Sequence, residues 1–182
     1  MANVTFDLET LGNTSNAPIV QIAAVIFGEE GQVIDSIDVK ADLGTIPDND
    51  FHLDYDTLRW WMNQIANNPS LVDVMNEGVF GHEDMVGRFS DWCEEMRKKH
   101  GQLFFWSHAT FDPPILDRHN SRYGYPRLPF RNQRDIRTLT HIAGYIEVTK
   151  NRKAHDAMAD CEYQARYIAK GLKILKDKGL KF

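Results

Sequence analysis

Two carboxylates near the start of the chain are spaced so that they could bind a metal ion together. Asp7 and Glu9 lie within residues 4–12, where apolar and polar residues alternate from Val4 onward. This period of two predicts a β-strand and places both carboxylates on one face of it. Carboxylate oxygens on a rigid strand are suitable ligands for a hard divalent cation. A strand with a solvated acidic face would have the same pattern, so the pair alone leaves both interpretations open.

A third carboxylate, Asp112, lies where the chain is expected to pass from a strand into a helix. It follows the apolar run 102–107, which predicts a buried strand. Strand-to-helix junctions are where α/β proteins present their site residues. The proline that follows Asp112 favours a second interpretation, in which the aspartate caps the helix. One carboxylate could serve both purposes.

A fourth carboxylate, Asp160, follows His155 by five residues at the start of the last predicted helix. On a regular helix, side chains five residues apart diverge by about 140°. The two side chains can converge only if His155 lies in the loop before the helix, with Asp156 as the helix cap. A surface histidine beside a solvated carboxylate is the alternative.

The rest of the chain predicts the elements that must hold these residues. Three β-rich runs joined by short turns predict an antiparallel meander whose first strand is central. The expected strands are residues 4–12, 18–27, 32–40 and 102–107, with a short strand entering a helix at 134–139. Helices are expected at 56–62, capped by Asp54 or Asp56, at 83–99, and after Asp112 and Asp156. A shorter helix is expected after residues 67–70.

Length, charge and cysteine content limit the class of protein. The 182 residues suit one domain. A formal net charge of −5 argues against binding of nucleic acid through bulk charge, but not against an acidic site that binds cations. Cys93 and Cys161 fall in predicted helices, so no disulfide is expected. No membrane-spanning segment or signal peptide is recognised, and a cytoplasmic location is expected.

Two local features have competing interpretations. One is a run of arginines that favours phosphate contact about as strongly as a solvated surface; its members are Arg118, Arg122, Arg127, Arg131, Arg134 and Arg137. The other is the pair Trp60 and Trp61 on a predicted helix. An aromatic pair on a helix indicates core or a subunit interface more often than base stacking.

Three short motifs, in this order and at these separations, resemble those of a known enzyme family. The motifs are Asp7-Leu8-Glu9-Thr10, Phe111-Asp112, and His155 followed by Asp160. They resemble the DEDD 3′-to-5′ exonuclease superfamily in its His-containing (DEDDh) branch, and most of all its compact RNase AS-like exoribonucleases and phage exonucleases. The resemblance implies a single DEDDh exonuclease domain over residues 1–182. It implies an α/β, ribonuclease H-like fold: a mixed sheet with an antiparallel meander and helices on both faces.

The resemblance also implies a chemistry and a cofactor. Two Mg²⁺ (or Mn²⁺) ions would be held by four carboxylates, those of Asp7, Glu9, Asp112 and Asp160. The ions would stabilise the attacking and leaving oxygens of phosphodiester hydrolysis. His155 would accept the proton of the attacking water, which suits a side chain whose ordinary pKa is about 6.5.

The implied substrate is single-stranded RNA or DNA with a free 3′ end, and the implied products are nucleoside 5′-monophosphates. Thr10 and Leu11 would bracket the terminal sugar and base. His108 stands where many members of the family have an asparagine, which would alter contacts near the scissile phosphate. A homodimer with the Trp60-Trp61 helix at its interface is compatible with the resemblance.

Several functions stay open on these observations. RNA is favoured as the substrate, and a phage-type 3′-to-5′ exodeoxyribonuclease is the enzymatic alternative, because recognition of the 2′-hydroxyl cannot be assigned to any residue. A non-catalytic nucleic-acid-binding module on the same fold is a second alternative. An assembly protein with merely solvated acidic residues is a third. The repulsion among the four carboxylates argues against the binding module. Stabilisation by Mg²⁺ or Mn²⁺ would distinguish an enzyme from the assembly protein.

Overall fold

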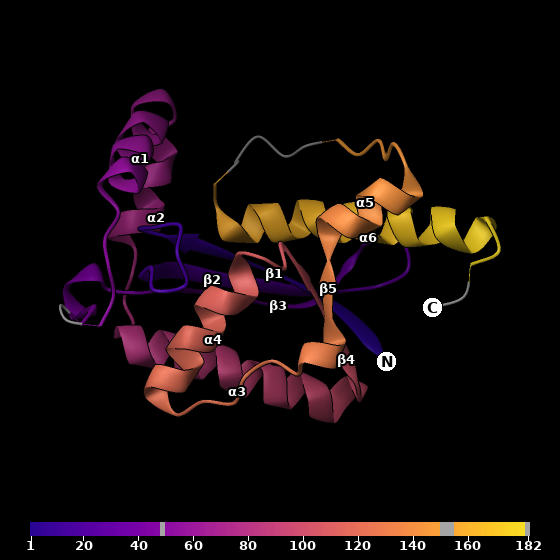
Figure 1. The fold of residues 1–182 in the computed structure, drawn as a ribbon, viewed down its shortest axis with the longest axis horizontal. Helices are drawn as coiled ribbons and strands as arrows, with labels where there is room; N and C mark the ends of the chain where they lie inside the picture. Colours follow the sequence, from indigo (N-terminus) through magenta and orange to yellow (C-terminus); the bar gives the residue numbers. More distant parts are fainter. Residues whose placement is uncertain (48–49, 150–154, 181–182) are drawn as a thin grey trace.

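The computed structural model describes residues 1–47, 50–149 and 155–180. A five-stranded sheet lies between layers of helices (Figure 1), with the strand order β3-β2-β1-β4-β5. The strands are β1 (Ala2–Thr10), β2 (Ile19–Phe27), β3 (Val33–Lys40), β4 (Leu103–Ser107) and β5 (Gln133–Asp135). The helices are α1 (Tyr55–Asn67), α2 (Val72–Asn76), α3 (His82–His100), α4 (Asp112–Tyr123), α5 (Ile136–Ala143) and α6 (Ala157–Asp177). Short 3-10 turns occupy Leu43–Thr45, Pro69–Leu71 and Phe130–Asn132.

The sheet is mixed, and β1 is its central strand. β1 pairs antiparallel with β2, which pairs antiparallel with β3, while β4 and β5 add parallel neighbours on the other side. The predicted meander with a central first strand is therefore confirmed. β1 begins and ends two residues earlier than predicted. It begins early because pairing with β4 starts at Ala2, and it ends at Thr10, where the register with β2 has shifted.

Helices cover both faces of the sheet, as predicted (Figure 1). On one face, the apolar side chains of β1 belong to the same buried cluster as those of α3 and α4. Phe6 of β1 and Phe89 of α3 are in ring contact within this cluster, with centroids 6.1 Å apart. The alternation of apolar residues along β1 is thus explained by one core-facing side.

α6 and α5 cover the opposite face, and small residues let α6 lie close to the sheet. Ala157 and Ala165 of α6 pack with Ala23 of β2 in a second buried cluster. The β2–β3 turn also approaches α6: Gly31 has a φ of 78°, and a Cβ there would lie 2.5 Å from the Cα of Arg166. Glycine is required at this position because any side chain would collide with the helix backbone.

The acidic face of β1 lies under α6 and is not solvated. Thr5, Glu9 and Thr10 are buried, and Asp7 is half-buried. The sequence pattern predicted a strand buried on one face only. The structure differs because α6, from the far end of the chain, covers the polar face as well.

α1 stands at the end of the sheet and separates the two adjacent tryptophans. Trp61 is buried in a third cluster with Leu11, and its Nε1 donates to the carbonyl of Thr10 at 2.9 Å. The expectation of a core position is confirmed for Trp61. Trp60 is 38% exposed and is not part of the core. Asp54 caps α1 by accepting from the amide of Asp56, as one of the two predicted alternatives had it.

The six arginines of the run at 118–137 do not act as one surface. Arg122 is paired with Asp50 at 2.7 Å, and Arg118 donates to Asn16 at 3.3 Å. Arg137 is exposed and forms no ion pair with any described carboxylate. Most of the run therefore makes local structural contacts, and Arg122 is the member with an ion pair among the described residues.

The two cysteines and the lengths of the helices bear on two further expectations, the absence of a disulfide and of a membrane-spanning segment. Cys93 and Cys161 lie in α3 and α6 and are free thiols, as predicted. None of the helices in the described part of the chain combines the length and apolar character needed to cross a bilayer.

Candidate active site

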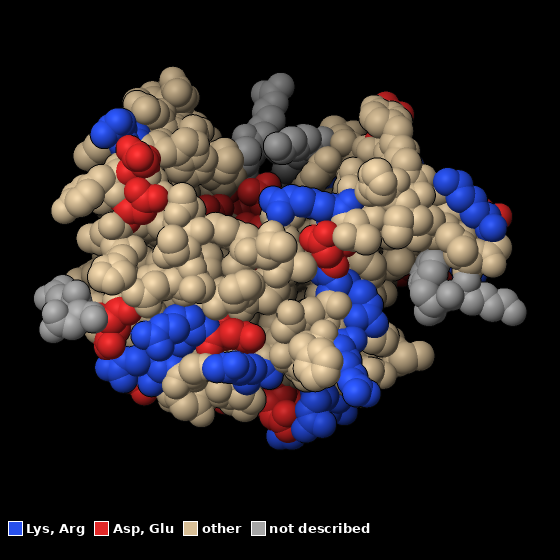
Figure 2. All heavy atoms as spheres, in the orientation of Figure 1, with Lys and Arg blue, Asp and Glu red and all other residues tan. Residues whose placement is uncertain are grey.

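Three of the four predicted carboxylates meet above the centre of the sheet. Ligand oxygens of Asp7, Glu9 and Asp160 all lie within 4.8 Å of one another. Asp7 and Glu9 project from the same face of β1, and Asp160 lies in the first turn of α6, which packs over that face. In Figure 2, acidic side chains line the floor of a hollow between the α1 and α5 sides of the molecule. The period-two pattern predicted that Asp7 and Glu9 lie together. The third carboxylate, Asp160, comes from a helix that begins about 150 residues later in the chain.

Asp112 is the fourth carboxylate, and it is 1% exposed. Its Oδ2 accepts from the amide of His108 at 2.9 Å, and its buried Oδ1 has no hydrogen-bond partner among the described residues. After burial, its charge is the first cause that raises the pKa of Asp7, although Asp112 is not one of the three carboxylates whose oxygens lie within 4.8 Å of one another. An unpartnered buried carboxylate oxygen is costly unless something else satisfies it.

The interpretation of Asp112 as a helix cap is wrong. Asp112 is the first residue of α4, and Phe111 precedes the helix. Pro113 and Pro114 have no amide hydrogens to donate, and the amide of Ile115 bonds to the carbonyl of Phe111 at 3.4 Å. The carboxylate therefore turns back toward His108 and the site.

Burial and mutual repulsion raise the pKa values of this acidic cluster. Burial first, and then the charges of neighbouring carboxylates, raise the pKa values of Asp7 and Glu9 well above their ordinary range. Burial raises the pKa of Asp112 to about 7, although the amides of His108 and Leu8 oppose the shift. A bound cation would reduce the electrostatic repulsion among these carboxylates. The donor set consists of carboxylate oxygens and includes the unpartnered Oδ1 of Asp112, so it fits Mg²⁺ or Mn²⁺.

Gln164 holds Asp7 in place and was not identified from the sequence. The Thr5 hydroxyl donates to Gln164 Oε1 at 2.6 Å, and Gln164 Nε2 donates to Asp7 Oδ1 at 3.0 Å. The hydrogen bond from Gln164 lowers the pKa of Asp7, against the effect of burial. Gln164 lies four residues after Asp160 and so shares its helix face, a spacing that could have identified it.

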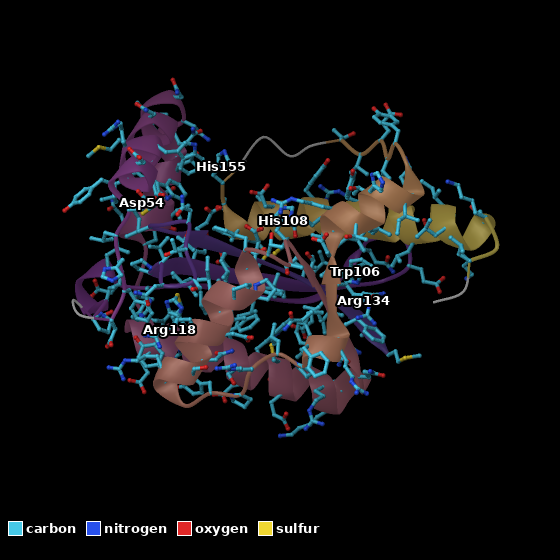
Figure 3. All side chains as sticks on the ribbon, in the orientation of Figure 1. Asp54, Trp106, His108, Arg118, Arg134 and His155 are labelled. Atoms are coloured by element: carbon cyan, nitrogen blue, oxygen red, sulfur yellow. The ribbon has the colours of Figure 1, made fainter. Side chains whose placement is uncertain are left out.

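His155 lies in the loop immediately before α6, as predicted. Its backbone has a φ of 68°, and its amide donates to Asp160 Oδ2 at 3.0 Å. Asp156 caps α6 by accepting from the amide of Ala159 at 3.2 Å, which confirms the predicted cap. The left-handed turn thus brings a histidine to the same carboxylate that the acidic cluster uses. Figure 3 shows His155 at the start of α6, beside α1.

Trp60 contacts His155 and is a second residue that the sequence did not assign. The two ring centroids are 4.7 Å apart and the rings meet edge to face, at 83°. Trp60 also contacts Trp61 edge to face, and Trp61 is fixed in the third cluster. The tryptophan pair therefore connects the core of α1 to the imidazole.

A cleft of about 370 Å³ opens beside Glu9, at the carboxyl end of β1. Thr10 lies on its wall, and its hydroxyl donates to the carbonyl of Gly12 at 2.6 Å. Trp60 and Phe111 supply aromatic walls. Leu11 is instead packed in the third cluster and is not among the residues lining this cleft.

His108 is half-buried at the end of β4, between Asp112 and the start of α5 (Figure 3). Burial, and then the charge of Arg137, lower the pKa of its imidazole. Its Nδ1 is buried and has no hydrogen-bond partner in the described part of the chain. The amide of His108 is bound to Asp112, while its role toward substrate stays a prediction.

Without divalent metal, the acidic cluster should make the protein less stable as the pH rises from about 4 to about 7. The pKa of Asp112 is about 7 in the folded protein, against an ordinary value of 3.8. The folded state therefore holds the proton more tightly, and its stabilising effect is complete below the ordinary pKa and lost as pH rises through the folded pKa. Melting temperatures in EDTA should show this loss, and Asp112→Asn should reduce it. An unchanged pH profile in Asp112→Asn would contradict the assignment.

Comparison with known families identifies the class of protein. Residues 2–172 match the model of the 3'-5' exoribonuclease Rv2179c-like domain, so the chain belongs to this family. The family is described as one of 3'-5' exoribonucleases, which agrees with the family predicted from the three motifs. A search of curated proteins found no match.

Solved structures confirm the predicted fold class. The nuclease domain of 3'hExo, a DEDDh family member bound to rAMP, is 13% identical with a TM-score of 0.63, covering 97% of this chain and 92% of that one. E. coli exonuclease I with a dT13 oligonucleotide is 16% identical with a TM-score of 0.66, covering 97% of this chain and 42% of that one. A zinc-bound form of the E. coli exonuclease I–ssDNA complex is 16% identical with a TM-score of 0.62, covering 97% and 40%. The chain spans less than half the length of the exonuclease I chains that it matches.

Proposed function

We propose that this protein is a metal-dependent 3′-to-5′ exonuclease that hydrolyses single-stranded nucleic acid, with RNA favoured, to nucleoside 5′-monophosphates. One observation carries the proposal: oxygens of Asp7, Glu9 and Asp160 lie within 4.8 Å of one another, next to the buried Asp112 and to His155. Three carboxylates that repel one another at this separation, with a fourth that acts on the pKa of Asp7, are explained by bound cations, which would in turn attract a phosphate.

The proposed cofactor is a pair of Mg²⁺ (or Mn²⁺) ions held by these four carboxylates. When bound, such a pair supplies charge stabilisation to the attacking and leaving oxygens and lowers the pKa of the attacking water. The chain itself supplies orientation: Gln164 fixes Asp7, and the amide of His108 fixes Asp112. Hydrogen bonds of this kind set the direction of ligand oxygens before a metal arrives.

His155 is the proposed general base. Its amide is bound to Asp160 and its ring is in contact with Trp60, so both the backbone and the imidazole are positioned. Histidine is the side chain suited to taking a proton near neutral pH, and the amide of His155 is bound to a carboxylate of the acidic cluster. Burial and Arg137 lower the pKa of His108, which makes it the weaker candidate.

The cleft of about 370 Å³ beside Glu9 is the proposed pocket for the 3′-terminal nucleotide. Its volume is within the range of small-molecule sites, and it joins the acidic cluster at Glu9. Trp60 and Phe111 offer aromatic surface to the base, and Thr10 lies where the sugar would be held. Leu11 would act behind this wall, through packing with Trp61.

A matched pair of substrates tests the function. Single-stranded RNA and DNA of the same sequence, labelled at the 5′ end, are incubated with Mn²⁺ and resolved on a gel. A ladder that shortens from the 3′ end of RNA alone supports the exoribonuclease, and a ladder on DNA supports the exodeoxyribonuclease. The family model favours RNA, while exonuclease I structures contain ssDNA. Intact substrates under several divalent metals would refute the proposal.

Gln164→Leu should weaken Mn²⁺ binding by about 10- to 100-fold, the usual effect of losing a partner of a metal ligand. A ligand at 100 times its Kd stabilises the native state by about 2.7 kcal/mol, so Mn²⁺ should raise the melting temperature of the wild type by about 5–10 °C. The measurement is the Mn²⁺ concentration at the midpoint of this rise. Gln102→Leu, at an exposed glutamine, is the matched control. An unchanged midpoint in Gln164→Leu would show that Gln164 does not act on the metal site.

The extent of the domain, the cellular location and the oligomeric state are proposed as well. We propose that residues 1–182 form one exonuclease domain and that the protein acts in the cytoplasm. A homodimer through α1 is also proposed, because Tyr55 and Met62 on this helix are 81% and 72% exposed. Light scattering of the purified protein measures the mass directly, and a monomer at all concentrations would exclude the dimer.

A further inference from the structure

A second and larger cleft, of about 550 Å³, lies between α5 and α6. Arg137 and His141 of α5 form one wall, Tyr163 and Tyr167 of α6 form the other, and residues 144–148 close one side. It shares no lining residue with the cleft beside Glu9. The function proposed above makes no use of it.

This second cleft lies along α6, one helical turn beyond Asp160. Tyr163 follows Asp160 by three residues on α6, and the charge of Asp160 is among the causes that raise the pKa of the Tyr163 hydroxyl, after burial. On the other wall, the charge of Arg137 acts on both Asp112 and His108. Figure 2 shows Lys or Arg side chains on the α5 side of the acidic hollow. The second cleft therefore lies one helical turn from Asp160, on the α5 side of the acidic cluster.

The lining of the second cleft suits a nucleobase. The rings of Tyr163 and Tyr167 are stacked, with centroids 5.7 Å apart and an interplanar angle of 21°, and Tyr145 is 88% exposed at the rim. Tyrosine rings bind bases by stacking without regard to sequence. Glu147 also lines the cleft and disfavours a phosphate near it, whereas Arg137 at the opposite wall favours one. The phosphate is thus expected at Arg137, beside the acidic cluster, and the base farther in.

We propose that the second cleft binds the base of the penultimate nucleotide, the one whose 3′ oxygen leaves when the terminal nucleotide is released. The inference rests on the proposed exonuclease function. With the terminal nucleotide beside Glu9 and the penultimate base against Tyr163, the phosphate between them is placed over the four carboxylates. The chain then recognises two consecutive nucleotides, one on each side of the scissile bond.

Two short oligoribonucleotides with 5′ labels test this subsite. They differ only at the penultimate position, where one has a base and the other is abasic. The wild type should release the terminal nucleotide from the intact oligonucleotide with a kcat/KM about 5- to 150-fold higher, the range that stacking of one base gives. Equal rates of the first cleavage would overturn the proposal.

Variants locate the effect. Tyr163→Ala should bring the ratio of the two rates close to one, and Tyr163→Phe should retain the wild-type ratio because the ring remains. Phe130→Ala, at a residue that is 78% exposed and lines neither cleft, is the control and should keep the ratio. A wild-type ratio in Tyr163→Ala would overturn the assignment, since a merely structural change would lower both rates without changing their ratio.

Binding without turnover separates this inference from the function on which it rests. Fluorescence anisotropy in Ca²⁺ measures the Kd of both oligonucleotides for the wild type and for Tyr163→Ala. If no oligonucleotide is hydrolysed in Mn²⁺ but the intact one binds more tightly in a manner that depends on Tyr163, the exonuclease proposal fails and the base site stands. Hydrolysis with equal Kd values and equal rates would leave the exonuclease standing and refute the base site.

Discussion

Asp7→Ala should abolish hydrolysis, with a loss of at least about 10³-fold, which exceeds the 10- to 100-fold loss usual for a partner of a metal ligand. Asp7 is the carboxylate on which the other three act: the charges of Asp112, Glu9 and Asp160 all raise its pKa, after burial. Its removal takes a ligand from the centre of the proposed metal pair. The measurement is release of nucleoside 5′-monophosphate from labelled single-stranded RNA in Mn²⁺.

The stability of the variant distinguishes a lost site from a lost fold. Asp7→Asn keeps the volume and the hydrogen-bond acceptor for Gln164 but removes a charge that is repelled in the absence of metal. In EDTA at pH 8, Asp7→Asn should therefore melt at a higher temperature than the wild type, while its rise in melting temperature with Mn²⁺ should be largely lost. Asp91→Ala, at an exposed aspartate of α3, is the control and should change neither quantity.

Results for Asp7 also decide between the enzyme and the non-catalytic alternatives. A nucleic-acid-binding module would show no metal-dependent turnover in the wild type and no effect of Asp7→Asn on binding of RNA. An assembly protein with solvated acidic residues would show no stabilisation by Mn²⁺ at all. Near-wild-type rates in Asp7→Ala would refute the proposed role of the cluster outright.

His155→Ala should lower kcat by about 10²- to 10⁴-fold, the range for loss of a general base. Metal binding should persist, because the contact that His155 makes with Asp160 runs through its backbone amide, which alanine retains. The Mn²⁺-dependent rise in melting temperature should therefore equal that of the wild type. Single-turnover hydrolysis at saturating RNA measures the rate.

A different result for His155 would require a different mechanism. Loss of the Mn²⁺ response in His155→Ala would make the imidazole a metal ligand. The matched control is His100→Ala, at a half-buried histidine at the end of α3 that lines neither cleft. Trp60→Phe keeps an aromatic contact to His155 and should retain most of the rate, whereas Trp60→Ala should lower it by disturbing the imidazole.

Local patterns in the sequence were sufficient for the parts of the site that depend on one element at a time. Asp7 and Glu9 share a face of β1 because a strand has a period of two, whatever surrounds it. His155 precedes α6 because Asp156 can cap a helix and the residue before a cap need not be helical. The order of the three motifs then identified the family, since it does not depend on coordinates.

Patterns with two local solutions were resolved only by contacts from elsewhere. Asp112 could cap α4 or face the site, and the paired prolines together with the amide of His108 decide for the site. Trp60 and Trp61 are alike in sequence, but Trp61 faces the third cluster and Trp60 faces His155. The spacing of residues along the chain predicts neither outcome, because it does not say which distant element packs against a given side of the helix.

The sequence by itself determined the central strand, the meander, the shared face of two carboxylates and the family. Tertiary structure alone decided that this acidic face is covered by α6, that Gln164 binds Asp7, and that one cleft opens beside Glu9 and another between α5 and α6. These features join residues up to 159 positions apart. Periodicity and capping act over a few residues, whereas burial, the pKa values of Asp7 and Glu9, and the walls of a cleft depend on which distant elements pack together.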